Sequence, residues 1–508
     1  MTDESPASAR GGEARWWIGG ALLLACALSL ALRSTFLREP FERDEGFYSA
    51  IALRLLDGGV PYRDGIDSKG PVLYYLYALA IGVLGRTTEA VRTFVMFYNL
   101  LTLWGVYRLA RGFSGRGAAL VAGFLYAILS SAPMTRASGA NAEVLLVLPL
   151  VWAAVFLLQW LRTRARGPLA SSGALLGVAL LIKSVAAPFA ALCAGVVMWQ
   201  ARRRGMLLRA GLSFAVPALA VVGGMSLYLA AHGAFGDFLY WTVLHGFRYA
   251  ASTLVAGPTL SFVVGYVGAE VAPIALLALP AIAMHPLRRR DPEGCLAGGL
   301  PAAAIVAVLL PGKNFAHYFI LLIPFFCVAT AGVLADAFRE TRRRAVGVGL
   351  ATLVGLALVN FGFREWRFYT RLSPEEVSIE KYGPIFVLAR EAGQYVRQRT
   401  GGGEYIFQWG FEPEIYLVAQ RRVPTRYVSS TLLPFAPDQD LALSQLRADL
   451  TAALPAMVVV FPEWADMPGE DVVRQFLADH GYIEEVRQRD VVIYRRPDLP
   501  PPASVGGS

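Results

Sequence analysis

Apolar stretches of about twenty residues recur through this 508-residue chain and constrain its fold more than any other feature. A bilayer core of about 30 Å needs roughly that many residues in helical conformation to cross it. Because lipid offers the backbone no hydrogen-bond partner, such stretches must be helices. Charged residues make up only 17% of the chain, whereas soluble proteins carry roughly a quarter. We therefore predict a polytopic α-helical membrane protein.

Basic loops between the apolar spans predict the topology. The spans fall near residues 16–32, 88–107, 117–133, 142–160, 169–182, 185–200, 207–231, 258–284, 296–311, 316–336 and 345–362. Arginine clusters follow alternate spans, within 108–116, 162–166, 202–204, 288–290 and 342–344. Short loops rich in Lys and Arg stay in the cytoplasm. We therefore expect a multi-pass protein of the inner (plasma) membrane, with the N-terminus in the cytoplasm and the C-terminal region periplasmic or extracellular. The net charge of +9 then reflects topology and not nucleic-acid binding.

Three segments could be counted as membrane spans in more than one way, and the topology depends on how each is counted. Residues 71–85 are apolar but short for a span, so we place them at the outer membrane surface. Residues 169–200 are interpreted as two spans on either side of Lys183. The first span lacks a clear small-x-small cleavage site and is predicted to be an uncleaved helix.

The composition changes after about residue 363, where no long apolar span remains. Helical spacing over 374–399 and 471–480 alternates with strand-like runs at 404–409, 457–461 and 491–494. This alternation predicts a small α/β domain. The predicted domains are a transmembrane domain over 1–362, an extracytoplasmic α/β domain over 363–498 and a disordered tail over 499–508.

The first outer loop, residues 33–87, holds the leading candidates for chemistry. Asp44 and Glu45 are adjacent carboxylates, and one carboxylate can act as a general base while its neighbour tunes its pKa. Lys69 supplies a positive charge that suits a phosphate oxygen. The structural alternatives are a solvated acid pair and a lysine that snorkels at the membrane surface.

Charged groups at membrane depth are costly, so several on one side of the bilayer indicate a site. Glu143 begins a span at its outer end, where the helix dipole also favours an acid and Asn141 is a candidate N-cap. Lys183 and Glu270 lie inside predicted spans and are candidates for a structural pair. The other outer candidates are His245, Arg248, Lys313, His317 and Tyr318, for which an interfacial belt of aromatic and basic residues is the alternative.

The first outer loop resembles that of the glycosyltransferase family 39-like group, which includes protein O-mannosyltransferases and lipid A aminoarabinose transferases. The resemblance lies in Arg43-Asp44-Glu45-Gly46-x-Tyr48, in Gly58-Gly59-x-Pro61-Tyr62-Arg63-Asp64 and in Asp67-x-Lys69-Gly70-Pro71-x-Leu73-x-Tyr75. Two later runs also resemble the group: Lys313-x-x-x-His317-Tyr318 and Gly410-Phe411-Glu412-Pro413-Glu414-x-Tyr416. The family has Lys-Pro-Pro where this chain has Lys69-Gly70-Pro71, a departure that keeps the lysine.

This resemblance implies the GT-C fold and transfer of a sugar from a polyprenyl-phosphate donor to a hydroxyl of a lipid, glycan or protein on the outer face. It implies that Asp44 is the general base with Glu45 beside it, and that Lys69 binds the donor phosphate near His317 and Tyr318. We add Arg248 and Lys313 to the phosphate-binding group, and we assign Glu143, Tyr48, Tyr62 and His245 to substrate binding.

The sequence has no metal-ligand spacing and predicts no bound cofactor. Whether a divalent cation joins the acidic pair stays open. The expected partners are the lipid-linked donor, the membrane and the acceptor, without nucleic acid. Two alternative functions also stay open: a secondary transporter, which would use mid-membrane ionisable residues, and a non-catalytic envelope-assembly protein.

Overall fold

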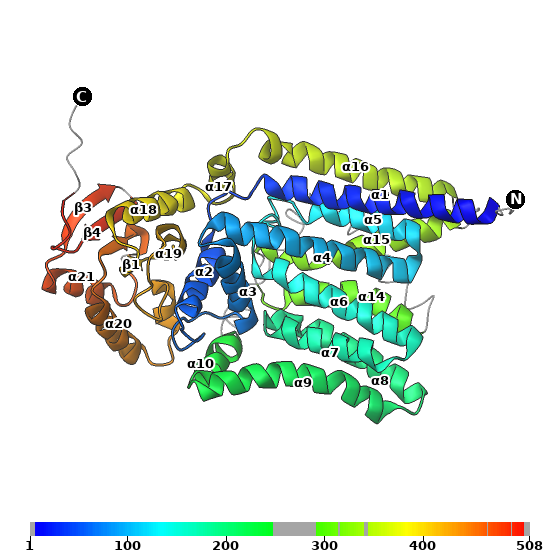
Figure 1. The fold of residues 1–508 in the computed structure, drawn as a ribbon, viewed down its shortest axis with the longest axis horizontal. Coiled ribbons are helices and arrows are strands. Elements are labelled where there is room, and N and C mark those ends of the chain that lie inside the picture. Colours follow the sequence, from blue (N-terminus) through cyan, green and yellow to red (C-terminus); the bar gives the residue numbers. More distant parts are fainter. Residues whose placement is uncertain are drawn as a thin grey trace, which may run out of the picture. The chain divides into compact units, whose positions relative to one another are not determined.

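The computed structural model describes residues 6–246, 291–312, 315–339, 344–464, 466–488 and 490–501. The chain divides into two compact units. The first, here the helical unit, comprises residues 1–36, 95–224 and 249–371. The second, here the mixed unit, comprises residues 37–94, 225–248 and 372–508. The mixed unit thus combines the first outer loop with the C-terminal region, which lie far apart in sequence (Figure 1).

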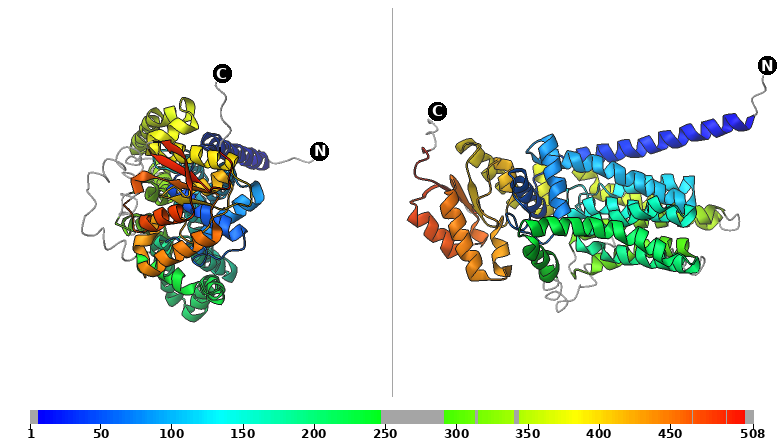
Figure 2. Two further views of the ribbon diagram at one scale, coloured as in Figure 1. Left: turned by 90° about the vertical axis from the view of Figure 1, so that its left-hand side faces the viewer. Right: turned by 60° about the horizontal axis from the view of Figure 1, so that its bottom comes forward.

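The helical unit consists of long helices that lie side by side (Figure 2). Helix α1 packs on α5, α5 packs on α15, and α15 packs on α14 and α16, while α6 packs on α7 and α14 packs on α8. Their bounds are α1 (Pro6–Ser34), α5 (Arg116–Leu129), α6 (Ala142–Thr163), α7 (Arg166–Leu180), η1 (Ser184–Ala186), α8 (Ala187–Arg203), α14 (Pro292–Leu309), η3 (Ala316–Leu321), α15 (Leu322–Arg339) and α16 (Arg344–Thr370). Helices α4 (Thr88–Ser114) and α9 (Leu207–Ala231) contribute to both units.

The apolar composition of these helices confirms the prediction of a multi-pass membrane protein. Within the described residues, seven segments are long and apolar enough to cross a bilayer: Trp16–Ser34, Ala142–Thr163, Ser184–Arg203, Leu207–Ala231, Pro292–Leu309, Ala316–Arg339 and Arg344–Thr370. Many large apolar side chains on them are exposed, such as Leu219 at 66% and Leu227 at 73%. A water-soluble protein would bury such a surface, whereas lipid covers it in a membrane protein.

The predicted spans agree with the helices in most places. The break between α7 and α8 falls around Lys183, so residues 169–200 are two helices as predicted. Helices α5 and α7 have 14 and 15 residues, shorter than a full crossing. The predicted span 258–284 and the arginine cluster 288–290 lie outside the described residues.

Two short helices of the first outer loop belong to the mixed unit. Helix α2 (Arg43–Leu56) packs on α3 (Pro71–Leu84). Helix α3 begins at Pro71, where the fixed φ of proline suits the first helical position, and ends at Gly85, whose φ of 109° a side chain would disfavour. The segment predicted as a short helix at 71–85 is therefore confirmed as helical, and its place at the membrane surface stays a prediction. Residues 235–244 add α10 (Phe235–Leu239) and η2 (Tyr240–Leu244).

The C-terminal part of the mixed unit is the predicted α/β region. Its four strands are β1 (Ile406–Trp409), β2 (Met457–Val460), β3 (Ile483–Gln488) and β4 (Val491–Arg495), in the order β1-β2-β4-β3. Strands β1 and β2 are parallel, with Ile406 opposite Met457, and the other two pairs are antiparallel. The helices are α17 (Pro374–Tyr382), α18 (Ile385–Arg399), α19 (Glu414–Ala419), α20 (Gln439–Ala453) and α21 (Glu470–Asp479), with the 3-10 turns η5 (Ser430–Phe435) and η6 (Pro462–Trp464).

Two details differ from the sequence prediction in this region. Strand β3 was not predicted, because its charged residues are partly exposed at the edge of the sheet and lack strand-like alternation. The helix predicted over 374–399 is two helices, because Gly383 has a φ of 79° and Pro384 follows it.

Candidate active site

The acidic pair lies in the first turn of α2, where the helix dipole favours negative charge. Glu42 is the N-cap residue, and the Glu42 N–H donates to Glu45 Oε2 at 3.1 Å as part of a capping box. The Glu45 side chain is fully buried, whereas Asp44 is partly exposed. The two adjacent carboxylates therefore have different environments, as two groups with different roles require.

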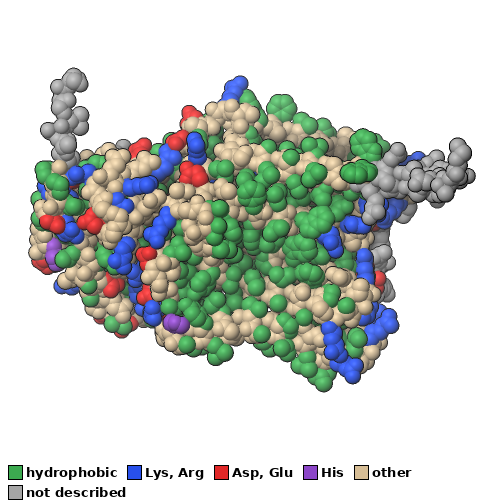
Figure 3. Space-filling view, in the orientation of Figure 1, with side chains coloured by type: hydrophobic (Ala, Val, Ile, Leu, Met, Phe, Trp, Pro, Cys, Tyr) green, Lys and Arg blue, Asp and Glu red, His purple; other side chains and the backbone are tan. Residues whose placement is uncertain are grey.

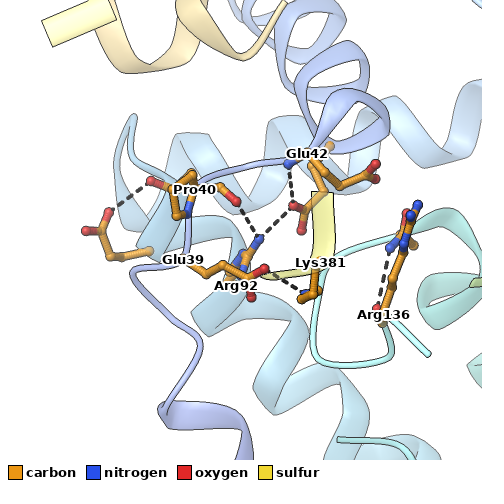
Figure 4. Close-up of polar contacts among 10 residues, drawn as sticks. Glu39, Pro40, Glu42, Arg92, Arg136 and Lys381 are labelled. Atoms are coloured by element: carbon orange, nitrogen blue, oxygen red, sulfur yellow. Dashed lines mark hydrogen bonds and ion pairs between the residues drawn. The ribbon is translucent and has the colours of Figure 1, made fainter. Parts of the chain in front are cut away.

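A buried ionic network fixes Glu45 (Figure 4). Arg92 donates to Glu45 Oε2 at 2.7 Å and to Glu39 Oε2 at 3.2 Å. Lys381 of α17 donates to the other Glu39 oxygen at 2.6 Å. Every one of these side chains is at most 4% exposed. Glu45 is therefore held by a buried ion pair at the start of α2. The sequence analysis missed this network because its members are far apart in the chain, with 47 positions between Glu45 and Arg92 and 342 between Glu39 and Lys381.

Lys69 lies two residues before the first residue of α3, in a segment whose backbone accepts hydrogen bonds from two tyrosines. The hydroxyls of Tyr62 and Tyr74 donate to the Lys69 carbonyl at 2.6 and 3.0 Å. Tyr74 also donates to Asp67 Oδ2 at 3.1 Å, and Lys69 Nζ lies 3.8 Å from Asp67 Oδ1. The Lys69 side chain is 17% exposed. The backbone of this loop thus fixes the lysine in place while part of its side chain remains accessible.

Lys69 and Asp44 lie on the same side of α2. Lys69 Nζ is 5.9 Å from the centroid of the Tyr48 ring. Tyr48 follows Asp44 by four residues, and side chains four apart on a helix share one face. Lys69 therefore lies beside Tyr48, on the face of α2 where the helical spacing also places Asp44.

The two tyrosines that we assigned to substrate binding are buried. Tyr48 is 1% exposed and its ring packs against Tyr74 and Tyr77. Tyr62 is 0% exposed and supports Lys69 through its hydroxyl. Both side chains therefore pack inside the mixed unit, and their direct contact with a sugar stays a prediction.

His245 lies at the end of η2 and packs between two aromatic rings. Its ring centroid is 5.3 Å from that of Trp241 and 5.1 Å from that of Phe435, in the C-terminal region. Tyr240 donates to the Phe435 carbonyl at 2.7 Å. The predicted site residues Arg248 and Lys313 and the predicted span residue Glu270 lie outside the described residues.

A second cluster of predicted residues lies in the helical unit. Glu143, 1% exposed at the start of α6, accepts a hydrogen bond from Lys183 Nζ. The same ammonium lies 4.3 Å from the centroid of the Tyr318 ring. The His317 and Tyr318 rings pack edge to face at 4.8 Å, and both residues are buried. Four ionisable or hydrogen-bonding groups from α6, η1 and η3 therefore converge.

This cluster changes two expectations. Lys183 pairs with Glu143, a contact that the sequence analysis did not predict, while its candidate pairing with Glu270 lies outside the described residues. Asn141 is the N-cap residue of α6, but its side chain does not cap the helix and instead donates to the Arg136 carbonyl at 3.5 Å. Sequence spacing cannot reveal the Glu143–Lys183 pair, because α7 separates the two residues along the chain.

The C-terminal region contributes a third set of contacts around α2. Arg43 pairs with Glu412 at 3.2 Å, and its guanidinium carbon lies 4.7 Å from the Phe411 ring centroid and 5.4 Å from that of Trp464. Burial raises the pKa of Glu412, against the opposing effect of Arg43. The motif Gly410–Tyr416, noted in the sequence for its family resemblance, therefore contacts the residue that precedes Asp44.

The comparisons with known proteins agree with this architecture. The crystal structure of ArnT from Cupriavidus metallidurans bound to undecaprenyl phosphate superimposes with a TM-score of 0.64 at 17% identity, covering 95% of this chain and 98% of that chain. The chain has the GT-C fold. The oligosaccharyltransferase of Archaeoglobus fulgidus in the apo form gives 0.54 at 16% identity, covering 88% and 70%. The archaeal oligosaccharyltransferase AglB from the same organism, in complex with an inhibitory peptide and a dolichol-phosphate, gives 0.51 at 14% identity, covering 96% and 75%.

A family model also matches part of the chain in sequence. Residues 68–228 match the family model described as dolichyl-phosphate-mannose-protein mannosyltransferase. The matched residues include Lys69, Glu143 and Lys183, and they begin after Asp44. None of the curated proteins matches the chain in sequence.

Proposed function

We propose that this protein is a membrane glycosyltransferase that moves a sugar from a polyprenyl-phosphate donor to an acceptor hydroxyl on the outer face of the membrane. The contact of Lys69 with Tyr48, one helical turn after Asp44 on α2, carries the proposal, since the reaction needs a base for the acceptor and a cation for the departing phosphate. The ArnT structure bound to undecaprenyl phosphate and the AglB structure with a dolichol-phosphate support a lipid-linked donor.

The proposed reaction is a single displacement at the anomeric carbon. Asp44 accepts the proton of the acceptor hydroxyl as its oxygen forms a bond to that carbon. The bond between the anomeric carbon and the phosphate oxygen breaks, and its electron pair leaves on the polyprenyl phosphate. Lys69 stabilises the charge of that leaving group. Attack opposite the phosphate inverts the anomeric configuration.

The remaining predicted residues take supporting roles in this proposal. Glu45 and its partner Arg92 orient the first turn of α2. Within the helical unit, Lys183 is paired with Glu143 and lies against the Tyr318 ring, beside His317, and we propose that this cluster contacts the lipid-linked substrate. Among the described residues, no group of three metal-ligating side chains lies together.

Two substitutions in the full-length protein test the assignment. Vesicles that contain the purified chain receive undecaprenyl-phosphate-linked sugars and envelope extract as the acceptor source, and mass spectrometry measures the undecaprenyl phosphate released. Asp44→Asn removes the base and should lower the rate by about 10²- to 10⁴-fold. Lys69→Ala removes the phosphate contact and should lower it by about 10²- to 10³-fold.

Asp57 and Arg86 provide matched controls within the mixed unit. They form an exposed pair at 3.4 Å, and such pairs contribute little to stability. Asp57→Asn and Arg86→Ala should therefore keep the parental rate. Parental activity in both Asp44→Asn and Lys69→Ala would disprove the site. Substrate counterflow without sugar transfer would favour a transporter instead.

A further inference from the structure

A cavity of about 400 Å³ lies in the helical unit between the C-terminal ends of α4 and α6. Three arginines line it: Arg108 and Arg111 from α4 and Arg162 from α6. Apolar side chains of α6, Val155 and Leu158, form its floor. The cavity lies at the C-terminal end of α6, whereas Glu143 lies in the first turn of that helix, so the cavity is separate from the Glu143 cluster.

The arginines of this cavity differ in how they are bound. Arg162 is fixed: it donates to Glu293 at 2.9 Å and to the Gly112 carbonyl at 2.7 Å. Gly112 also lets Leu158 of α6 approach α4, because a side chain there would meet Leu158 Cδ2 at 2.5 Å. Arg108 and Arg111 are exposed and, among the described residues, have no ion-pair partner. Arg162 on α6 is thus neutralised by Glu293, whereas Arg108 and Arg111 on α4 have no carboxylate paired with them among the described residues.

A row of exposed apolar side chains runs along α4 and ends at Arg108. Phe97, Leu101, Trp104 and Arg108 follow each other at spacings of three or four residues, so they share one face of the helix. Phe97, Leu101 and Trp104 are 54%, 55% and 37% exposed. From Phe97 to Arg108 the helix rises about 16 Å, close to half of a bilayer core of about 30 Å. Figure 3 shows the corresponding pattern, with blue side chains at the right-hand end of the helices beside a broad green surface.

We propose that the α4–α6 cavity binds the phosphate headgroup of an anionic phospholipid, with the acyl chains along Phe97, Leu101 and Trp104. Guanidinium groups bind phosphate oxygens in bidentate geometry. Basic pockets between transmembrane helices are suited to anionic lipid headgroups. Topology alone explains why arginines gather at this end of the helices. It does not explain why two of them line a cavity with no carboxylate paired to them in the described part of the chain, while the third arginine is bound to Glu293.

The test compares lipid binding to the full-length protein and to Arg108→Gln/Arg111→Gln. Native mass spectrometry and thermal unfolding in detergent measure binding of phosphatidylglycerol, phosphatidylcholine and inorganic phosphate. Phosphatidylglycerol should bind the parent and raise its unfolding temperature, because a ligand of the folded state stabilises it. The double variant should bind it on the order of 30-fold more weakly, from about 1 kcal/mol for each lost basic contact.

Arg202→Gln/Arg203→Gln is the matched control, since it removes the same charge from the exposed end of α8. This control should keep parental phosphatidylglycerol binding. Equal binding by the Arg108→Gln/Arg111→Gln variant and the parent would overturn the proposal. So would equal stabilisation by phosphatidylcholine, which indicates unspecific apolar contact, or by inorganic phosphate, which indicates a free-anion site.

Discussion

At the scale of single residues, the most unusual group in the mixed unit is Glu414, at the start of α19. It is 1% exposed, and its two carboxyl oxygens have no hydrogen-bond partner among the described residues. Burial, followed by the negative charge of Glu412, raises the pKa of Glu414 well above its ordinary value. The backbone beside it leaves no spare room, because a side chain at Gly46 of α2 would meet the Glu414 amide nitrogen at 2.6 Å.

Glu414→Gln should change how stability depends on pH. The folded state keeps the Glu414 proton, and the unfolded chain releases it above a pKa of about 4.5. Unfolding therefore releases a proton in the window between the two pKa values, and the parent loses about 1.4 kcal/mol for each pH unit in that window. The glutamine variant lacks this loss, so its unfolding temperature should exceed that of the parent at pH 8 and approach it near pH 4.5.

The exposed Glu391→Gln on α18 is the control, and it should leave the pH dependence of unfolding as in the parent. A difference between Glu414→Gln and the parent that stays constant from pH 5 to pH 8 would contradict a raised pKa. The sequence named Glu414 within a family-like motif but gave no sign of its burial, because burial here results from the contact of α19 with α2, which lies some 370 positions earlier.

At the scale of elements, helix α2 carries the proposed base Asp44 in its first turn, so the position of this helix determines where the base lies. Sequence analysis predicted the residues of this element that carry charge, since an acidic pair in an apolar context is visible in the sequence. It did not predict the groups that orient the element, because Arg92, Lys381 and Glu412 come from separate segments and only the fold brings them to α2. The same reason explains the missed partner of Lys183.

The Arg43–Glu412 ion pair should affect the rate of catalysis, because it holds the residue that precedes the proposed base. Arg43→Met leaves the buried Glu412 without its counter-charge, and Glu412→Gln leaves Arg43 without its acceptor. Each should lower kcat by about tenfold or more with a smaller change in KM, because Asp44 follows Arg43 directly. The double variant should lose less than the sum of the two singles, as expected for residues in contact.

Arg390 and Glu375 supply the control pair, at 2.6 Å between α17 and α18 of the same unit. Arg390→Met/Glu375→Gln should keep kcat near the parental value. Strictly additive losses for the Arg43 and Glu412 variants would show that the pair does not act as one positioning unit.

At the scale of the whole molecule, the alternation of basic loops predicts which end of the helices faces the cytoplasm. A single cysteine at Leu441, 53% exposed on α20, should react with a membrane-impermeant maleimide in spheroplasts. A cysteine at Arg203, exposed at the end of α8, should react only after lysis. The parent, whose cysteines are buried or half-buried, measures background labelling. Reaction of both positions before lysis, or of neither, would contradict the predicted topology.

The composition of the mixed unit has a consequence for protein engineering. Residues 37–94 and 372–508 fold together, and the pairs Glu39–Lys381, Arg43–Glu412 and Arg54–Val423 each join one stretch to the other. A chimera that takes only its C-terminal portion from a GT-C relative would break all three junctions at once. Functional hybrids should therefore arise only when both stretches are exchanged as a set from one parent.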